Sequence, residues 1–256
     1  MPDVRGHTRK YWQYEYDVAV RYMVPLLERW GVRVKGASVI DVGCGEGGGL
    51  CAFYDRGARS FGFDIDRHRV EAAESLKEGR DIRFANGNIY EESFPFFGNQ
   101  YDLVVLHDVF EHLEEKEKMM ARLKGFVGPG GRVLITFPPY FSAFGAHQQH
   151  LSAPLARLPF FHLIPFTLSR VLPRLAGEDP SVVQEVRKLG RLRMGMRAFE
   201  RIAVASGMKV ERKRSYLISL NHIRFGLRPI VAGPIAEIPL LGEALCTGVV
   251  YLLSPR

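Results

Sequence analysis

The sequence has few cysteines and no long apolar run. Its three cysteines, Cys44, Cys51 and Cys246, form no CxxC pair, so a reducing, cytoplasmic setting is the simplest expectation. No apolar stretch approaches the ~20 residues that a membrane-spanning helix needs. The start, MPDVRGHTRKYWQYEYD, is polar and aromatic, unlike a secretory signal. Internal repeats and low-complexity segments are also missing, and the sequence predicts a globular cytoplasmic protein.

The charge is unevenly placed along the 256 residues. Apolar residues make up 46% and charged residues 25%, which is typical of a soluble domain of average to large size. The net charge is +7, yet residues 1–156 hold 19 basic against 21 acidic side chains. Residues 157–228 hold 15 against 5. This basic segment is either a solvated surface or a surface for a partner with phosphates or carboxylates.

Residues 37–135 alternate short apolar runs with helical patterns, which indicates βαβ units on a parallel sheet. The pattern predicts strands at 37–42, 59–64, 81–85, 101–106 and 131–137. It predicts helices between them at 47–56, 67–78 and 114–126, after an N-terminal helix near 11–30. The turn cluster Gly128-Pro129-Gly130-Gly131 is expected to separate the last of these helices from the fifth strand.

Beyond Phe137 the amino-acid composition changes. A proline- and aromatic-rich segment follows that is too long for an ordinary connection between two elements. We therefore expect a cap over the site at 139–196, containing a helix from Pro180. The remainder, 197–256, would complete a doubly wound, mostly parallel, seven-stranded α/β sheet with an antiparallel pair at 208–218 and 246–253. Residues 1–34 would form a helical lid and residues 35–138 a cofactor-binding core.

The stretch VIDVGCGEGGG, residues 39–49, is the first functional signal. Its spacing Gly43-x-Gly45-x-x-Gly48 leaves a strand and opens a helix, where the backbone can approach a ligand and the helix N-terminus favours an anionic group. That suits NAD and S-adenosylmethionine (SAM) equally. Asp41, at the strand end, favours a cofactor with an ammonium group. Asp64 ends the second strand, where an acid accepts the hydrogen bonds of a ribose diol in either class.

The continuation GNIYEESFPFFGNQYDLVVLHDVFEHL, residues 87–113, completes an ordered set of motifs. With the DVGCGEG loop, the acid after strand two and the Pro129-Gly130-Gly131 turn, residues 35–138 resemble the class I SAM-dependent methyltransferases. The resemblance is greatest to the small-molecule branch related to ubiquinone-biosynthesis methyltransferases. It implies a Rossmann-like methyltransferase fold and SAM as the cofactor.

The resemblance also implies roles for individual residues. The backbone of Gly43, Cys44 and Gly45 should line the methionine moiety, with Asp41 near its ammonium. Asp64 should hold the ribose hydroxyls, Ile65 should pack on the adenine, and His107 should face the sulfonium. Asn88 stands where the family has an aspartate that accepts from the adenine amino group, and the neighbouring Ile89 belongs to the same wall.

Two clusters could carry further chemistry. His107, Asp108, Glu111 and His112 do not have the H-E-x-x-H zinc spacing, so we expect no metal there and a supporting role for His112. His147-Gln148-Gln149-His150 follows the fifth strand, at the ligand-binding edge of the sheet. His147 and His150 are the candidates for acceptor chemistry. The alternative is a polar loop that merely hydrogen-bonds the cap.

The sequence thus predicts a SAM-dependent methyltransferase that acts on a small-molecule or lipid-like acceptor, with O-methylation by in-line displacement as the expected reaction. The rivals are an NAD(P)-dependent reductase and a non-catalytic SAM-binding regulator. A nucleic-acid acceptor is disfavoured, because no RNA-binding motif is present. An amphiphilic acceptor, presented at a membrane surface, would use basic residues of the cap helix and nearby aromatics, namely Arg187, Lys188, Arg191, Arg193, Phe141, Phe144, Phe160 and Phe161. A cap with buried aromatics and solvated arginines is the alternative.

Overall fold

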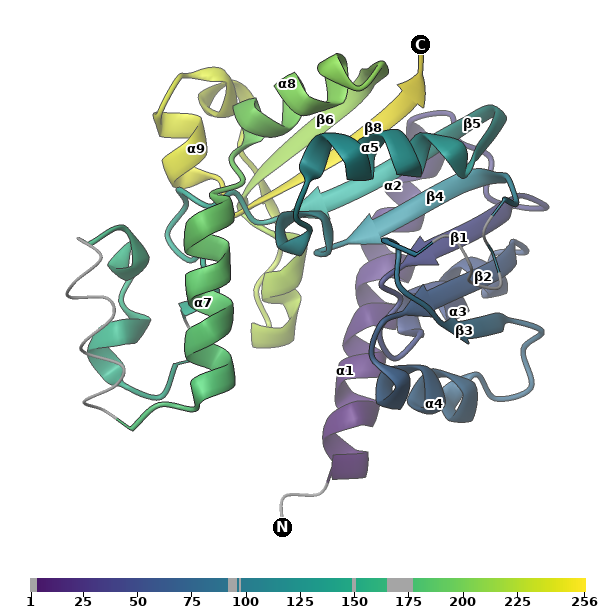
Figure 1. The fold of residues 1–256 in the computed structure, drawn as a ribbon, viewed down its shortest axis with the longest axis horizontal. Helices are drawn as coiled ribbons and strands as arrows, with labels where there is room; N and C mark the ends of the chain where they lie inside the picture. The colour runs from purple at the N-terminus through teal and green to yellow at the C-terminus, as the bar shows by residue number, and fades with distance from the viewer. Residues whose placement is uncertain (1–3, 92–95, 97, 149–150, 165–176) are drawn as a thin grey trace.

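An eight-stranded sheet runs through the computed structural model, which describes residues 4–91, 96, 98–148, 151–164 and 177–256. The strand order is β3-β2-β1-β4-β5-β8-β6-β7 (Figure 1). Parallel pairing joins β1 (Ser38–Val42), β2 (Arg59–Asp64), β3 (Arg83–Asn86), β4 (Tyr101–His107) and β5 (Val127–Phe137). Antiparallel pairing adds β8 (Gly248–Pro255), β6 (Met208–Ile218) and β7 (Ile230–Val231). The predicted doubly wound, mostly parallel α/β fold is confirmed, and the strand count of seven is corrected to eight by the two-residue β7.

Helices cover both faces of the sheet. The α-helices among the described residues are α1 (Val4–Val18), α2 (Val24–Arg29), α3 (Gly48–Asp55), α4 (Arg67–Leu76), α5 (Lys116–Gly125), α7 (Pro180–Leu192), α8 (Met196–Ala205) and α9 (Leu241–Leu245). Short turns of 3₁₀ helix lie at η2 (Phe110–His112), η4 (Pro154–Arg157), η5 (Phe161–Leu163), η6 (Leu220–Phe225) and η7 (Gly233–Glu237). In Figure 1, α5 and α8 lie together along one face of the sheet, and α1 passes the other.

Strand β4 shows why this arrangement needs an uninterrupted apolar run. Val104 and Leu106 pack in the core on the side of α5 and α8. Leu103 and Val105 pack in a second core with residues of α1 and α3. Because successive side chains of a strand point to opposite faces, a strand covered on both sides must be apolar at every position.

The N-terminal helix is longer than predicted and carries an irregularity. It begins at Val4 and reaches Arg29, with one π-helical turn, η1 (Ala19–Met23), between α1 and α2. Pro25 follows that turn at once. Proline has no N–H and crowds the carbonyl four residues earlier, so a widened turn is the ordinary accommodation.

The predicted turn before the fifth strand lies inside that strand. β5 begins at Val127, which pairs with Tyr101, and the next pair joins Leu103 to Arg132. The Gly-Pro-Gly-Gly sequence between them forms an irregular bulge, in which Gly130 has a φ of +73°. The Gly-Pro-Gly-Gly sequence does change the direction of the chain, as predicted. However, the fifth strand starts before it, because Val127 already pairs with Tyr101 of β4.

The segment after β5 folds against itself as well as against the sheet. Leu151, Phe161 and Val183 form one small apolar cluster, and Tyr140, Ala146 and Leu189 form another. Helix α7 starts at the predicted proline, and Asp179 caps it by accepting from the Ser181 amide at 2.8 Å. Figure 1 shows α7 beyond the arrowheads of β4 and β5, next to η2.

Gly48 permits α1 to dock on α3, and this can be tested. A Cβ at Gly48 would lie 2.1 Å from the backbone oxygen of Trp12, an atom that cannot move without displacing α1. We expect Gly48→Ala to lower the free energy of unfolding by about 1–3 kcal/mol, measured by urea denaturation. Gly125→Ala is the matched control, since an added Cβ meets nothing within 4 Å there. Equal stability of both variants would contradict this account.

Candidate active site

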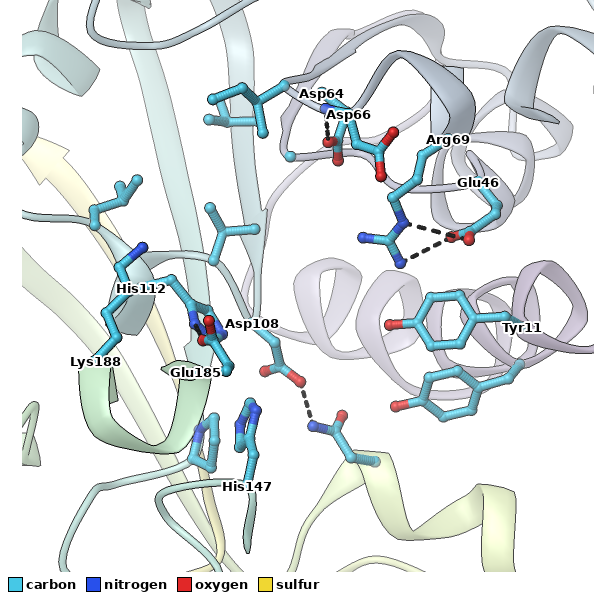
Figure 2. Close-up of a pocket in the computed structure, with 18 of the residues that line it drawn as sticks. Tyr11, Glu46, Asp64, Asp66, Arg69, Asp108, His112, His147, Glu185 and Lys188 are labelled. Carbon is cyan, nitrogen blue, oxygen red and sulfur yellow. Dashed lines mark hydrogen bonds and ion pairs between the residues drawn. The ribbon is translucent and has the colours of Figure 1, made fainter. Parts of the chain in front are cut away.

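A cavity of about 1060 Å³ lies beyond the carboxyl ends of the parallel strands. Its walls come from the segments that follow β1, β2, β3, β4 and β5, and from α1, α7 and η6. Parallel strands end at one edge of the sheet, so short loops after several strands meet there. In Figure 2, Asp64, Asp66, Glu46 and Arg69 lie in one part of this cavity, whereas His112, His147, Glu185 and Lys188 lie across it.

The glycine loop has the backbone that the sequence predicted. Gly43 and Gly45 have φ of +76° and +54°, and Gly47 precedes α3 in the left-handed region. Gly43 lines the cavity, and a Cβ there would lie 2.6 Å from a Val109 methyl group. Cys44 is buried behind the loop, and Gly45 faces Glu15 of α1. Because these glycines have no side chains, a ligand can approach one side of the loop and α1 can pack against the other.

A carboxylate of the chain itself occupies the N-terminus of α3. The Gly48 amide donates to Glu15 Oε2 at 3.2 Å, and burial raises the pKa of Glu15 well above its usual range. Nearby, Arg69 and Glu46 form an ion pair at 3.0 Å on the cavity wall. A dinucleotide would place its pyrophosphate at this helix end. Glu15 already fills that position, which argues against the NAD(P)-dependent alternative.

Two aspartates end β1 and β2 in different ways. Asp64 lines the cavity, and its Oδ2 and Oδ1 accept from the amides of Gly45 at 3.0 Å and Asp66 at 2.8 Å. Asp41 is buried beneath the loop, and its Oδ1 has no hydrogen-bond partner. Burial, with the charge of Asp64 as the second cause, raises the pKa of Asp41 to about 7. Asp41 is thus a buried carboxyl group with no hydrogen-bond donor or positive charge among the described residues paired with its Oδ1.

An apolar wall and an amide lie beside Asp64. Ile65 is 70% exposed although it is apolar, and it lines the cavity with Asn88 and Ile89. Asn88 Oδ1 accepts from the Tyr90 amide at 3.0 Å. One acceptor direction of Asn88 is therefore used to hold its own loop, which the sequence pattern did not indicate.

His107 is placed differently from the expectation. Its Nδ1 lies 2.6 Å from Thr136 Oγ1 of β5, and its side chain is not among those that line the large cavity. Asp108 lines it instead, with Oδ1 accepting from Thr136 at 3.1 Å and Oδ2 accepting from Asn221. Asp108 follows the end of β4 with a φ of +55°, so the chain leaves the strand there and the residue after His107 faces the cavity.

The far wall joins residues from three distant segments. His112 of η2, His147 after β5 and Glu185 of α7 all line the cavity. Glu185 Oε1 lies 2.5 Å from His112 Nδ1, and the two histidine rings meet edge-on with centroids 5.3 Å apart. Gln148 is buried and donates to the Ala143 carbonyl at 2.7 Å, which holds the loop. Gln149 and His150 lie outside the described residues. Sequence reasoning noted His112 but missed Glu185, whose position only α7 decides.

Comparison with known proteins agrees with this geometry. A family model described as a methyltransferase domain matches residues 40–135. Residues 40–135, less than half of the chain, are therefore similar to the methyltransferase domains of this family. Phosphoethanolamine N-methyltransferase 2 of Caenorhabditis elegans is 27% identical over 158 residues, which cover 58% of this chain and 36% of that protein. The cypemycin N-terminal methyltransferase of Streptomyces sp is 28% identical over 48% of this chain and 52% of that protein.

The fold itself is shared with solved methyltransferases. Magnesium protoporphyrin IX methyltransferase from Synechocystis PCC 6803, with bound SAH, superposes with a TM-score of 0.55 at 17% identity, over 96% of this chain and 84% of that one. The chain covers between about a third and a half of the length of the curated relatives named above. In the described part of the chain, no helix is long and apolar enough to cross a membrane.

The residues present fit SAM as the cofactor of this domain. Asp41 is not among the residues that line the cavity, but its unpartnered Oδ1 beneath the loop would accept from an ammonium group through water. Asp64 faces the cavity as an acceptor for hydroxyl groups, and the exposed Ile65 offers an apolar surface to a base. Gly43 has no side chain, so its backbone is accessible where the loop lines the cavity. These are the complementary groups that a nucleoside bearing an amino acid requires.

Asp64 provides the first test of this site. Asp64→Ala should weaken SAM binding by about 1.5–3 kcal/mol, because a buried diol loses a charged acceptor. Isothermal titration calorimetry measures the change. Asp179→Ala is the matched control, since Asp179 caps α7 through the Ser181 amide at 2.8 Å and is not among the residues that line the cavity. It should lower thermal stability by about 1 kcal/mol with less effect on affinity. Unchanged affinity in Asp64→Ala would refute the role of Asp64.

Asp41 makes SAM binding pH-dependent. Its pKa of about 7 lies above the unfolded value near 3.9, so this group stabilises the free fold less as pH rises from about 4 to 7. A bound ammonium favours the carboxylate, so SAM must displace a proton below pH 7. Affinity should rise up to about tenfold from pH 5.5 to 7, with proton release seen by calorimetry in two buffers. Asp41→Asn should abolish the slope, and an equal slope in that variant would exclude Asp41 as its source.

Proposed function

We propose that the protein is a SAM-dependent methyltransferase that methylates an oxygen of an amphiphilic small molecule. The observation that carries this proposal is the continuity of the cavity. One space of about 1060 Å³ connects the glycine loop and Asp64 with the wall of His112, His147 and Glu185. A ligand pocket for one drug-sized molecule measures about 300–1,000 Å³. The volume therefore suits a cofactor and an acceptor side by side.

The chemistry divides between the two walls. Bound SAM supplies a methyl group on an activated sulfonium carbon. The residues around Asp64 and Ile65 hold and orient the cofactor, which provides most of the catalysis in a displacement of this kind. A hydroxyl acceptor must lose its proton as it is methylated. His147 is our candidate for the group that takes it, because it lines the far wall next to the His112–Glu185 pair.

Charge and apolarity on the cavity wall support an amphiphilic acceptor. Lys188, Arg157 and Arg224 line the cavity, where they would attract a phosphate or carboxylate. Phe144 and Phe225 line it too and would contact an apolar body. Of the eight basic and aromatic residues named from the sequence, Lys188 and Phe144 are among those lining the cavity.

Other apolar side chains near this wall face solvent. Leu155, Leu158 and Leu163, from the turns η4 and η5, are 64%, 53% and 43% exposed. They flank Arg157, whose side chain lies in the cavity wall. An apolar rim beside a basic group would suit a lipid-like acceptor drawn from a membrane surface. We include such contact in the proposal.

Transfer of labelled methyl groups into a cell extract tests the proposal. The purified protein with methyl-labelled SAM should label a compound that partitions into butanol from water. His147→Ala should reduce the rate about 100-fold, the scale of a lost general base, while SAM affinity changes less than threefold. His68→Ala is the control, because this histidine side chain is 93% exposed on α4. Absence of any labelled product would favour the SAM-binding regulator, and a water-soluble product would refute the amphiphilic acceptor.

A further inference from the structure

The wall opposite the glycine loop contains a compact set of metal-ligand side chains. Glu111 and His112 lie in η2, just after β4, and His147 lies after β5. One potential ligand atom of each residue lies within 4.8 Å of those of the other two. The spacing of residues along the sequence does not match a familiar zinc motif, because the third member comes from a separate loop.

Glu111 is the least expected member of this set. Its side chain is 2% exposed, and neither carboxylate oxygen has a hydrogen-bond partner. Lys116 Nζ lies nearby, but it donates to the main-chain oxygens of Phe110 and Glu111 rather than to the carboxylate. A buried carboxylate without hydrogen bonds is strongly unfavourable unless a proton or a cation compensates it. Burial accordingly raises the pKa of Glu111.

His112 is oriented so that one nitrogen faces Glu111. Its Nδ1 is held by Glu185 at 2.5 Å, and its Nε2 lies 3.5 Å from Glu111 Oε1. A carboxylate on one ring nitrogen is the usual way in which proteins orient a metal-binding histidine and increase the basicity of the other nitrogen. With metal–ligand distances of about 2.1 Å, two atoms 3.5 Å apart subtend about 110° at a shared ion, which is the tetrahedral angle.

We propose that Glu111, His112 and His147 bind a divalent transition-metal ion, Zn²⁺ by preference, with Glu185 positioning His112. Two imidazoles and one carboxylate form a donor set that Zn²⁺ uses in catalytic sites, where a fourth position stays open. His112 and His147 line the large cavity, so the open position would face it. The sequence-based expectation of no metal considered His107, Asp108, Glu111 and His112 together. His107 and Asp108 bond to Thr136 instead, and His147 was not part of that set.

A metal ion bound by these residues would change how the acceptor loses its proton. This consequence rests on the proposed function. An acceptor hydroxyl that takes the open position would lose its proton at a lower pH. In the metal-bound form His147 is a ligand and cannot take that proton, which would leave to bulk water, so the metal would replace His147 in generating the nucleophile. Binding of the metal does not depend on that reaction and can be measured without it.

Metal titration of the full chain, expressed without a histidine tag and treated with chelator, tests the binding. Isothermal calorimetry with Zn²⁺ should give one site per chain, and Co²⁺ should produce the visible absorption of a tetrahedral complex. Glu111→Gln and His147→Ala should each lower Zn²⁺ affinity more than tenfold and remove the Co²⁺ bands. Glu185→Gln should lower Zn²⁺ affinity about 10- to 100-fold, the scale of a lost orienting partner. Millimolar Mg²⁺ should not displace Zn²⁺, since Mg²⁺ prefers oxygen ligands.

Controls keep this test separate from folding and from methyl transfer. SAM affinity and the circular dichroism spectrum should be the same in the metal-free wild type and in Glu111→Gln. His68→Gln, at an exposed histidine on α4, should bind Zn²⁺ like the wild type. Absence of a stoichiometric Zn²⁺ site, or equal affinity in Glu111→Gln and His147→Ala, would overturn the proposal. Displacement by Mg²⁺ would overturn the choice of a transition metal. Failure of methyl transfer with intact Zn²⁺ binding would refute the proposed function alone.

Discussion

The carboxylate of Asp64 ties together the ends of two neighbouring strands, and the cofactor side of the site depends on it. One oxygen accepts from Gly45 in the loop after β1, and the other accepts from Asp66 in its own loop. The amides of Gly43 and Cys44 in the same loop donate to the Phe63 carbonyl at 2.8 and 3.1 Å. Because these bonds and those of Asp64 fix the loop after β1, α3 starts in a defined place, and Glu15 of α1 accepts from the Gly48 amide.

Docking of α1 against that loop has consequences for both stability and ligand choice. Trp12 packs in the core on one side of the helix, whereas Tyr11 and Tyr14 line the cavity on the other. Glu15 stands between them and takes the anion position at the start of α3. An amphipathic helix thus completes the core, forms a cavity wall and discriminates between nucleotide cofactors. A pyrophosphate would have to displace a buried carboxylate, but a cationic cofactor would not.

The opposite wall has another origin. His112, His147 and Glu185 come from three segments that are far apart in the sequence, and α7 brings the last of them to the cavity. Glu111 lies behind them without a hydrogen bond to its carboxylate. The methyltransferase domain, residues 40–135, contributes two of these four residues. Chemistry at the acceptor therefore depends on the segments that follow the domain.

The sequence by itself determined the mostly parallel sheet, the approximate positions of its strands along the chain and the cofactor. Those features depend on local patterns, because strands that are buried on both faces must be apolar and a loop with positive φ needs glycine. It also pointed to Asp64 and Ile65, which line the cavity at the end of β2, and to Asp41, which is buried beneath the loop. Tertiary structure decided that Asp108 rather than His107 faces the cavity, since His107 still belongs to β4 and bonds to Thr136, whereas Asp108 turns out of the strand with a φ of +55°. Tertiary structure also brought His112, His147 and Glu185 together. They come from segments that are distant in the sequence, and their contact depends on how α7 packs.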